Sequence, residues 1–324
     1  MIRRLIILLL IVGCEPEPED CAGVAGGDAY LNECNICINT SQGDIDYYNI
    51  FNNLNRPTDL FINQISNECE IFYDQLTATI SEDIINVDDA YILIDGDISD
   101  NHILISAPHS QRTYRYNGDS CSGDLNEHCR DKYTGAIAQY LNQLMGCSII
   151  ISKNKSDDPN YYDIIPEGTE TPAFSDIVGE PLPYKQAIKD YLSTNNNIKM
   201  IIDLHGFVNM ISRSDQNIEI GTMDSLSLNG NINYCLPHII EEIFARHNIS
   251  DINNNSSEFA SINQSTVTKY ITDQISTDIN RNYDAIQMEV DNDYRGCEIA
   301  NTKHLNFINA MIEIIYVLNQ LYKL

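Results

Sequence analysis

Short apolar runs alternate with longer amphipathic stretches beyond residue 44. The apolar runs have the length and composition of strands and lie at 91–95, 103–107, 147–152, 198–204, 218–221 and 285–290. The amphipathic stretches have helical spacing and lie at 132–145, 184–192, 234–247 and 299–322. Because helices separate strands that are largely apolar, the pattern predicts an α/β fold with helices on both faces of the sheet.

The polar segments between these elements are predicted to be turns and loops. Residues 96–101 form an acidic turn between the first two strands. This turn lacks the central Gly and the terminal Glu of a calcium-binding loop, which favours a solvated turn. The Asn-rich segment 253–257 is also predicted to be a loop.

The N-terminus has the composition of an export signal. A basic start at residues 1–4 is followed by an apolar run at 5–12, which is shorter than the about 20 residues of a membrane-spanning helix. Residues 11–14, Ile-Val-Gly-Cys, resemble the lipobox of bacterial lipoproteins, and this resemblance implies lipidation of Cys14. An ordinary short signal or a buried strand is the alternative. We predict a signal peptide at 1–13 and a lipid-anchored, extracytoplasmic protein.

Residues 14–43 differ in composition from the rest of the chain. Residues 15–20 are acidic and interrupted by Pro, which is typical of an extended stalk. The segment 20–37 resembles a short Asp-Cys-x-Gly-x-x-Gly-Gly module that serves as a spacer in exported marine bacterial proteins. We therefore predict a stalk and spacer at 14–43 and one large domain at 44–324.

Export changes the interpretation of the ten cysteines. Nine remain besides Cys14, so in an oxidising compartment several pair and at least one stays free. Cys121 and Cys129 are eight apart in a polar segment and form the best local pair. Cys34 and Cys37 form a C-x-x-C motif, but no second pair at zinc-finger spacing follows, which disfavours a metal site there.

The formal net charge of −28 restricts the partners of the protein. A chain this acidic cannot bind nucleic acid by general phosphate neutralisation and is repelled by anionic lipid headgroups. We therefore exclude nucleic acid as a partner.

Candidate chemical groups lie at or near the ends of three predicted strands. His109 follows the run 103–107, Asp203 and His205 follow 198–202, and Glu289 lies within 285–290. Ligands of open α/β sheets bind at the carboxyl ends of strands. Catalytic zinc takes three protein ligands and keeps one position for water. This pattern predicts zinc bound by His109 and His205, with Glu289 as the general base and Asp203 orienting a ligand.

The third zinc ligand is expected to be a carboxylate between the two histidines. Asp119, Asp124, Glu127 and Asp131 all compete for this role. We favour Asp131 because it begins a predicted helix, which is a fixed element. The alternative is that Asp131 only caps that helix, as Asp commonly does.

The same motifs carry a resemblance to a known family. The strings 103–110 (ILISAPHS), Asp131, 203–205 (DLH), 218–221 (IEIG), 267–269 (VTK) and 286–289 (IQME) resemble, in this order, the N-formylglutamate amidohydrolase family, which is related to the zinc carboxypeptidases. The resemblance covers about residues 101–320. It implies a zinc amidohydrolase on a three-layer α/β/α sandwich with a mostly parallel mixed sheet. It places His109, Asp131 and His205 at the metal-ligand positions and Glu289 at the catalytic carboxylate.

Arginine placement adds an expectation about the substrate. Six of the ten arginines lie in or beside these segments: Arg112, Arg115, Arg130, Arg213, Arg281 and Arg295. Arginine binds carboxylates bidentately, so we predict Arg112, Arg213, Arg281 and Arg295 as substrate-binding candidates. The alternative is that these arginines neutralise nearby acids such as Glu127 and Asp293.

The sequence thus predicts an exported Zn²⁺-dependent amidohydrolase or carboxypeptidase-like hydrolase. Its substrate would be an N-acyl amino acid or peptide, cleaved at an amide bond next to a carboxylate. One alternative is a surface binding protein that keeps the fold without turnover. Another is a serine hydrolase using Ser106 or Ser110, although neither lies in a Gly-x-Ser-x-Gly motif.

Overall fold

The computed structural model describes most of the predicted elements. The described residues are 17–64, 91–97, 99–110, 113–114, 127–128, 131–152, 183–207, 217–229, 235–256, 261, 266–296 and 301–324. They belong to two compact units, Met1–Leu54 and Asn55–Leu324. The signal peptide, Cys14, Cys121 and Cys129 lie outside the described residues.

The first unit contains a small disulfide-bonded motif. Its elements are β1 (Tyr30–Leu31), β2 (Cys37–Ile38), η1 (Thr40–Gln42) and α2 (Tyr47–Asn53). β1 and β2 pair antiparallel, and a disulfide joins Cys21 to Cys37. Cys34 is also disulfide-bonded. The C-x-x-C motif therefore offers no pair of thiols for a metal or for redox chemistry, and its disulfides are typical of an oxidising compartment.

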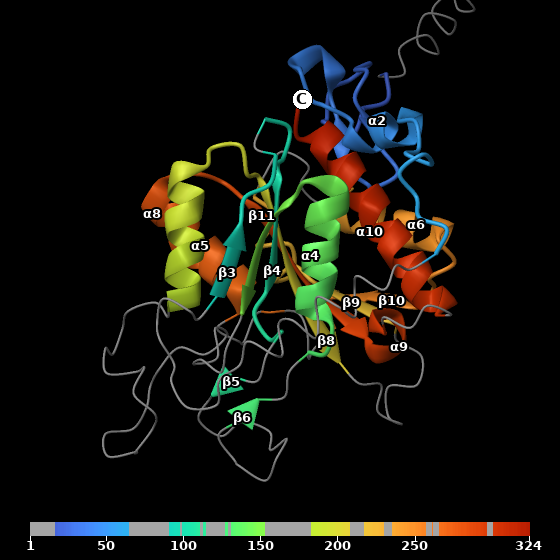
Figure 1. Ribbon diagram of the computed structural model, residues 1–324. Helices are drawn as coiled ribbons and strands as arrows, with labels where there is room; N and C mark the ends of the chain where they lie inside the picture. Colours follow the sequence, from blue (N-terminus) through green and yellow to red (C-terminus); the bar gives the residue numbers. More distant parts are fainter. Residues whose placement is uncertain are drawn as a thin grey trace, which may run out of the picture. The chain divides into compact units, whose positions relative to one another are not determined.

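A seven-stranded mixed sheet organises the second unit (Figure 1). Its strands, in spatial order, are β10 (Ile252–Asn254), β9 (Ile218–Gly221), β11 (Asp284–Asp291), β8 (Met200–Phe207), β4 (Ile103–Ala107), β7 (Ser148–Ser152) and β3 (Tyr91–Ile94). The four central strands β11, β8, β4 and β7 are parallel, whereas β9 and β3 run antiparallel to their inner neighbours. The central strands are almost entirely buried, as expected for strands covered on both faces.

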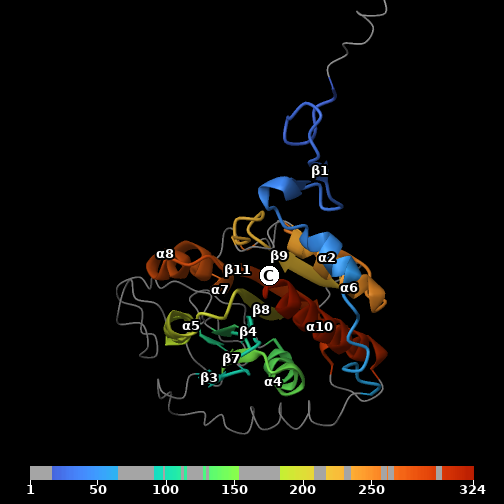
Figure 2. The same cartoon turned by 90° about the horizontal axis from the view of Figure 1, so that it is seen from above.

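Helices cover both faces of this sheet and give three layers (Figure 2). One face carries α5 (Pro183–Thr194), α7 (Val267–Tyr270), the π-helix η4 (Ile271–Ile275) and α8 (Ser276–Ile279). The other carries α4 (Thr134–Met145), α6 (Cys235–Arg246) and α10 (Thr302–Leu321). The short helix α9 (Asn292–Arg295) follows β11, and a separate pair, β5 (Thr113–Tyr114) and β6 (Glu127–His128), lies outside the main sheet. The predicted three-layer α/β/α fold with a mostly parallel sheet is confirmed.

Apolar residues early in β4, β8 and β11 pack against α5 and α7. Leu104 on β4, Ile201 on β8 and Ala285 on β11 are fully buried in one cluster with Ile188 of α5 and Tyr270 of α7. Burial of each large apolar side chain contributes about 1.5–3 kcal/mol. Since side chains alternate along a strand, residues two and four positions further on point to the same face. The polar residues of the candidate site lie at these positions, further along the same strands and on the same face.

One expectation about local structure is wrong, and two other features were not predicted. The segment predicted as a loop at 253–257 begins within the edge strand β10, which pairs with β9 through its backbone. An edge strand needs a partner on one side only, so apolar alternation is not required of it. The first two strands are not neighbours, because β7 lies between β3 and β4. The helical segment Val267–Ile279 is absent from the predicted elements, and only its first three residues belong to a quoted motif.

Cys147 fits the expectation that at least one cysteine stays free. Among the described cysteines, Cys147 is free and buried, and burial raises the pKa of its thiol to about 12.

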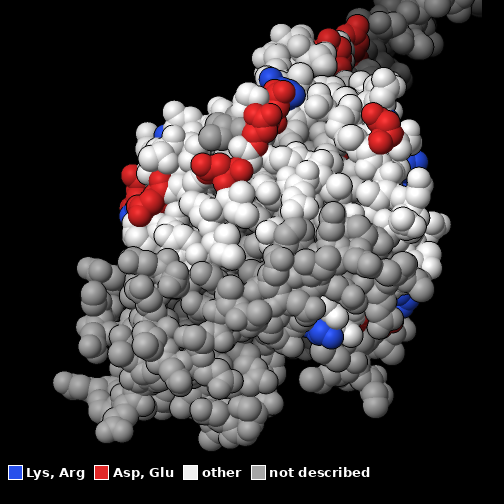
Figure 3. All heavy atoms as spheres, in the orientation of Figure 1, with Lys and Arg blue, Asp and Glu red and all other residues white. Residues whose placement is uncertain are grey.

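Over the described part of the face in Figure 3, acidic side chains are scattered among uncharged ones, and no broad basic patch is visible. Within the described ranges, no helix has both the length and the apolar composition needed to cross a membrane.

Candidate metal centre

The candidate site lies at the carboxyl ends of the central strands. Asp203 and His205 lie two and four positions beyond Ile201 on β8, and Glu289 lies four beyond Ala285 on β11. They therefore share the sheet face that packs against α5 and α7. Glu289 and His205 are direct neighbours in the parallel pairing of β11 with β8. This face of the sheet is therefore apolar near the start of the strands and polar at their carboxyl ends.

Three buried side chains converge on one point. The Nδ1 atoms of His109 and His205 are 3.2 Å apart, and Asp131 Oδ2 lies 3.4 Å from the first and 3.3 Å from the second. His109 is 4% exposed, His205 is 2% exposed and Asp131 is 7% exposed. Their ligand atoms form the buried group that could hold a metal ion among the described residues.

Local backbone geometry brings Asp131 to the histidines. The N–H of Asp131 donates to the carbonyl of His109 at 2.7 Å. Gly135, at the start of α4, allows close packing there, because a Cβ would lie only 2.7 Å from the Cβ of Ser110. The residue that precedes the helix is Tyr133, and no side chain caps its first turn. The carboxylate of Asp131 thus faces the imidazoles and does not act as the helix cap.

The donor set fits a small divalent cation. Ligands held tetrahedrally about 2.0–2.2 Å from zinc are roughly 3.3–3.6 Å apart, close to the separations of the three atoms here. Asp131 Oδ2 is buried without a hydrogen-bond partner, although it faces both imidazoles. An orphaned buried carboxylate oxygen is costly, and a bound cation would satisfy it. Two imidazoles and one carboxylate are a zinc-type ligand set.

The charges of the buried groups around the cluster also favour a bound cation. Burial opposes ionisation of Asp131, but His109 and His205 outweigh it and hold the pKa of that carboxyl well below its usual range. Burial also opposes a charge on His205, but Asp203, Glu289 and Asp131 raise its pKa well above the ordinary value. Three buried carboxylates thus surround two imidazoles. A cation bound between the three ligand atoms would offset this buried negative charge.

A chain of hydrogen bonds holds the imidazole of His205 through its Nε2 atom. Asp203 Oδ2 lies 3.1 Å from His205 Nε2, and Ser106 Oγ donates to Asp203 Oδ1 at 2.8 Å. The hydroxyl of Tyr184 on α5 is 3.2 Å from Ser106 Oγ. Ser110 Oγ donates to the carbonyl of Ser152. Both serine hydroxyls therefore donate to oxygen acceptors and not to a histidine base, which argues against the serine-hydrolase alternative.

Glu289 lies next to the three ligand atoms. Its Oε1 is 4.0 Å from His205 Nδ1 and accepts a hydrogen bond from Gln287 Nε2 at 2.7 Å. Gln287 in turn accepts from Ser261 Oγ. Burial raises the pKa of Glu289, the neighbouring His205 opposes that rise, and Asp131 adds to it. A carboxylate with a raised pKa, beside a candidate metal, has the properties of a general base.

Sequence reasoning did not identify Gln287, Ser261 or Tyr184 as supports of the site. Gln287 carried an available signal, because it lies two positions before Glu289 on one strand and hence on the same face. Tyr184 and Ser261 are distant in the sequence and carried none. Asp119, Asp124 and Glu127 lie outside the residues whose side chains are described.

Of the four predicted substrate-binding arginines, the structure describes Arg281 and Arg295, and neither directs its guanidinium to the ligand atoms. Arg281 precedes β11 and donates to the carbonyls of Leu192 and Ser193 at the end of α5, whereas the cluster is at the opposite end of β11. This placement corrects the expectation that Arg281 lies in the substrate site. Arg295 is close to the cluster, but all its described hydrogen bonds go to backbone carbonyls. Arg112 and Arg213 lie outside the described residues.

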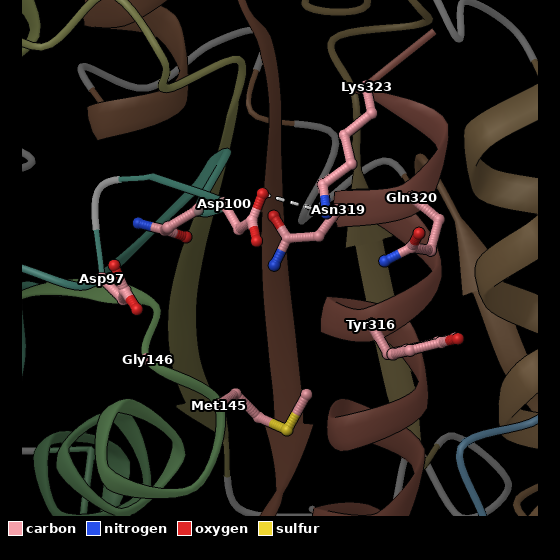
Figure 4. Close-up of a pocket in the computed structure, with 9 residues that line it drawn as sticks. Asp97, Asp100, Met145, Gly146, Tyr316, Asn319, Gln320 and Lys323 are labelled. Carbon is pink, nitrogen blue, oxygen red and sulfur yellow. Dashed lines mark ion pairs between the residues drawn. The ribbon is translucent and has the colours of Figure 1, made fainter.

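A cavity of about 230 Å³ lies at the other end of the sheet (Figure 4). Asp97 and Asp100 of the turn before β4, Met145 of α4, and Tyr316 and Lys323 at the end of the chain line it. Lys323 pairs with Asp100 at 3.2 Å. Because the turn precedes β4 and His109 follows it, this cavity is separate from the metal cluster.

Comparisons with known proteins found similarities in structure. No protein-family profile and no curated protein sequence matches the chain. The N-formylglutamate amidohydrolase from Ralstonia eutropha JMP134 is similar with a TM-score of 0.46 at 13% identity, over 71% of this chain and 97% of that one. A metallo-carboxypeptidase from Burkholderia cenocepacia is similar with a TM-score of 0.38 at 11% identity, over 81% and 70%. The apo Cell Shape Determinant protein Csd4 from Helicobacter pylori gives 0.40 at 13%, over 71% and 54%. With identities this low, function has to be argued from the geometry of the cluster.

Proposed function

We propose that this protein is a zinc-dependent hydrolase that cleaves an amide bond next to a carboxylate. The observation that carries the proposal is the convergence of His109 Nδ1, His205 Nδ1 and Asp131 Oδ2 within 3.4 Å, with Glu289 Oε1 4.0 Å from one of them. The three residues would hold the ion. Zinc bound there would supply a Lewis acid for the scissile carbonyl and lower the pKa of the attacking water.

The side chains of the chain itself would perform the proton transfers. Glu289 would accept the proton of the attacking water and return it to the leaving nitrogen. Gln287 fixes one oxygen of Glu289, which leaves the other for this exchange. Asp203 fixes the ring of His205. A protein that only binds a ligand does not need a buried carboxylate in this position, which favours an enzyme over a binding protein.

Recognition of the substrate carboxylate is assigned to the remaining candidates. Arg281 and Arg295 direct their donors to backbone carbonyls, so Arg112 or Arg213 is proposed as the clamp. The substrate class is therefore N-acyl amino acids or peptides with a free carboxylate. Export and lipid anchoring at Cys14 belong to the same proposal, supported by the disulfide of the first unit.

Metal content and hydrolysis together test the function. The full chain should hold about one zinc ion, measured by elemental analysis, and hydrolyse members of a panel of N-acyl amino acids and peptides. A chelator should abolish hydrolysis and added zinc should restore it. His205→Ala should lose the ion, whereas the exposed His238→Ala on α6 is the matched control and should keep it. Hydrolysis that survives removal of all metal would exclude the zinc mechanism, and zinc without hydrolysis of any panel member would favour a binding protein.

A further inference from the structure

Arg295 connects the three segments that carry Asp131, His205 and Glu289. It ends helix α9 and is 2% exposed. Its Nε donates to the carbonyl of Val290 at 2.9 Å, its Nη2 to that of Phe207 at 3.0 Å, and its Nη1 to that of Lys132. Val290 follows Glu289, Phe207 is two residues beyond His205, and Lys132 follows Asp131. One rigid guanidinium thus joins the backbone next to each of these three residues.

The sequence provides the space for this guanidinium at Gly206. A Cβ at Gly206 would overlap Cζ, Nε and Nη1 of Arg295. Gly206 pairs with Val290 across β8 and β11, one position after the pair of His205 and Glu289. Because successive residues of a strand point to opposite faces, the guanidinium lies behind the cluster, on the side away from the ligand atoms.

The position of Arg295 also matters for its charge. Burial lowers the pKa of Arg295, and the carboxylates of Asp131, Glu289 and Asp291 counteract that effect. A buried guanidinium is costly unless its donors are satisfied, and here Nε, Nη1 and Nη2 each donate to a backbone carbonyl. The geometry uses the fixed fork of arginine, which the single ammonium of a lysine cannot reproduce.

We propose that Arg295 is a positioning residue for the metal centre and not a substrate clamp. Its guanidinium, seated on Gly206, holds the backbones of Asp131, His205 and Glu289 at the spacing that metal binding requires. The link to metal rests on the proposed function, whereas the seating of Arg295 on Gly206 does not.

Zinc affinity of the full chain tests the link to metal. Arg295→Met should weaken zinc binding, measured by competition with a chromogenic chelator, by about 10–100-fold, as for other groups that orient ligands. Arg295→Lys keeps the charge but not the fork, and should recover only part of this loss. Arg246→Met removes the ion pairs of Arg246 with Glu242 and Glu313. It is the control and should leave zinc affinity unchanged. Wild-type affinity in Arg295→Met, or full recovery in Arg295→Lys, would overturn the proposal.

A double-mutant cycle tests the seating without metal. In chelator-treated protein, Gly206→Ala should lower the midpoint of urea unfolding strongly in the wild type and much less in an Arg295→Lys background, because the flexible lysine can yield to the new methyl group. Equal shifts in both backgrounds would overturn the seating. If the wild type holds no zinc, the proposed function and the positioning role for metal both fail, and the cycle then decides only whether the guanidinium and Gly206 are coupled.

Discussion

Asp203 Oδ2 lies 3.1 Å from Nε2 of His205, two residues further along the same strand. A carboxylate only accepts hydrogen bonds, so Nε2 carries the ring proton and donates it. The lone pair of the neutral ring is then on Nδ1, the atom that faces His109 and Asp131. The contact with Asp203 therefore favours the tautomer of His205 that can bind a metal through Nδ1.

Replacing Asp203 by Asn should test this selection. The amide has nearly the same shape but can present either a donor or an acceptor to Nε2, so the ring proton is no longer fixed. We expect Asp203→Asn to weaken zinc binding by about 10–100-fold. Chelator competition measures this, and circular dichroism checks the fold. An unchanged zinc affinity would show that Asp203 does not orient the ligand.

Ser106 offers a separate test of the reaction type. Its hydroxyl donates to Asp203 and is buried. Removing it in Ser106→Ala leaves the contact between Asp203 and His205, so we expect hydrolysis to fall less than about tenfold, as for an outer support. Steady-state kinetics on the best panel substrate measures this. Complete loss of turnover, with zinc still bound, would revive the serine-hydrolase mechanism.

Glu289→Gln should separate proton transfer from metal binding. The amide keeps the size of the side chain but cannot accept a proton from water. We expect kcat to fall by about 10²–10⁴-fold, the usual contribution of general base catalysis. Zinc content should remain at the wild-type level, measured on the same sample. Gln287→Met, which removes the donor to Glu289 Oε1, serves as a milder comparison. Undiminished turnover in Glu289→Gln would exclude Glu289 as the base.

Cys14→Ser should release the protein from the membrane. A thiol at this position is required for lipidation, and the predicted anchor depends on it. In the bacterial host, the wild type should sediment with membranes and incorporate labelled fatty acid, whereas Cys14→Ser should do neither. Cys147→Ser is the control, because Cys147 is buried and free and immediately precedes β7. Labelling of Cys14→Ser at the wild-type level would exclude this anchor.

The sequence was sufficient for those features that depend on residues close together along the chain. Apolar runs predicted the central strands, and period-two alternation explains why Asp203 and His205 share a face. The structure brings His109 and Asp131 together with His205, and each of the first two follows or precedes an element that the apolar pattern predicted. The surroundings of Arg295 could not be predicted, because its partners lie on three segments far apart in the sequence. Local charge clustering suggested a substrate clamp, whereas the fold directs the guanidinium to backbone carbonyls.

Glu313, on the α10 layer away from the metal centre, gives a prediction about acid stability. Its buried carboxylate contacts Arg56 at 3.0 Å, Arg246 at 3.1 Å and His247 at 2.8 Å. Burial opposes its ionisation, but these three partners outweigh burial and lower its pKa from 4.5 to about 2. A pKa lowered in the folded state means that the unfolded chain takes up the proton first as the pH falls. The stabilisation is therefore complete above about pH 4.5 and is lost between there and about pH 2.

Glu313→Gln should remove this contribution. At pH 7 we expect the variant to lose about 3 kcal/mol of unfolding free energy, as for breaking a buried ion pair. The difference from the wild type should shrink as the pH falls below about 4.5 and vanish near pH 2. Urea unfolding with chelator present measures it at each pH. His304, whose pKa burial lowers to about 4, titrates equally in both proteins and cancels in the difference. A difference that stays constant down to pH 2 would mean that the ionised carboxylate is not what Arg56, Arg246 and His247 stabilise.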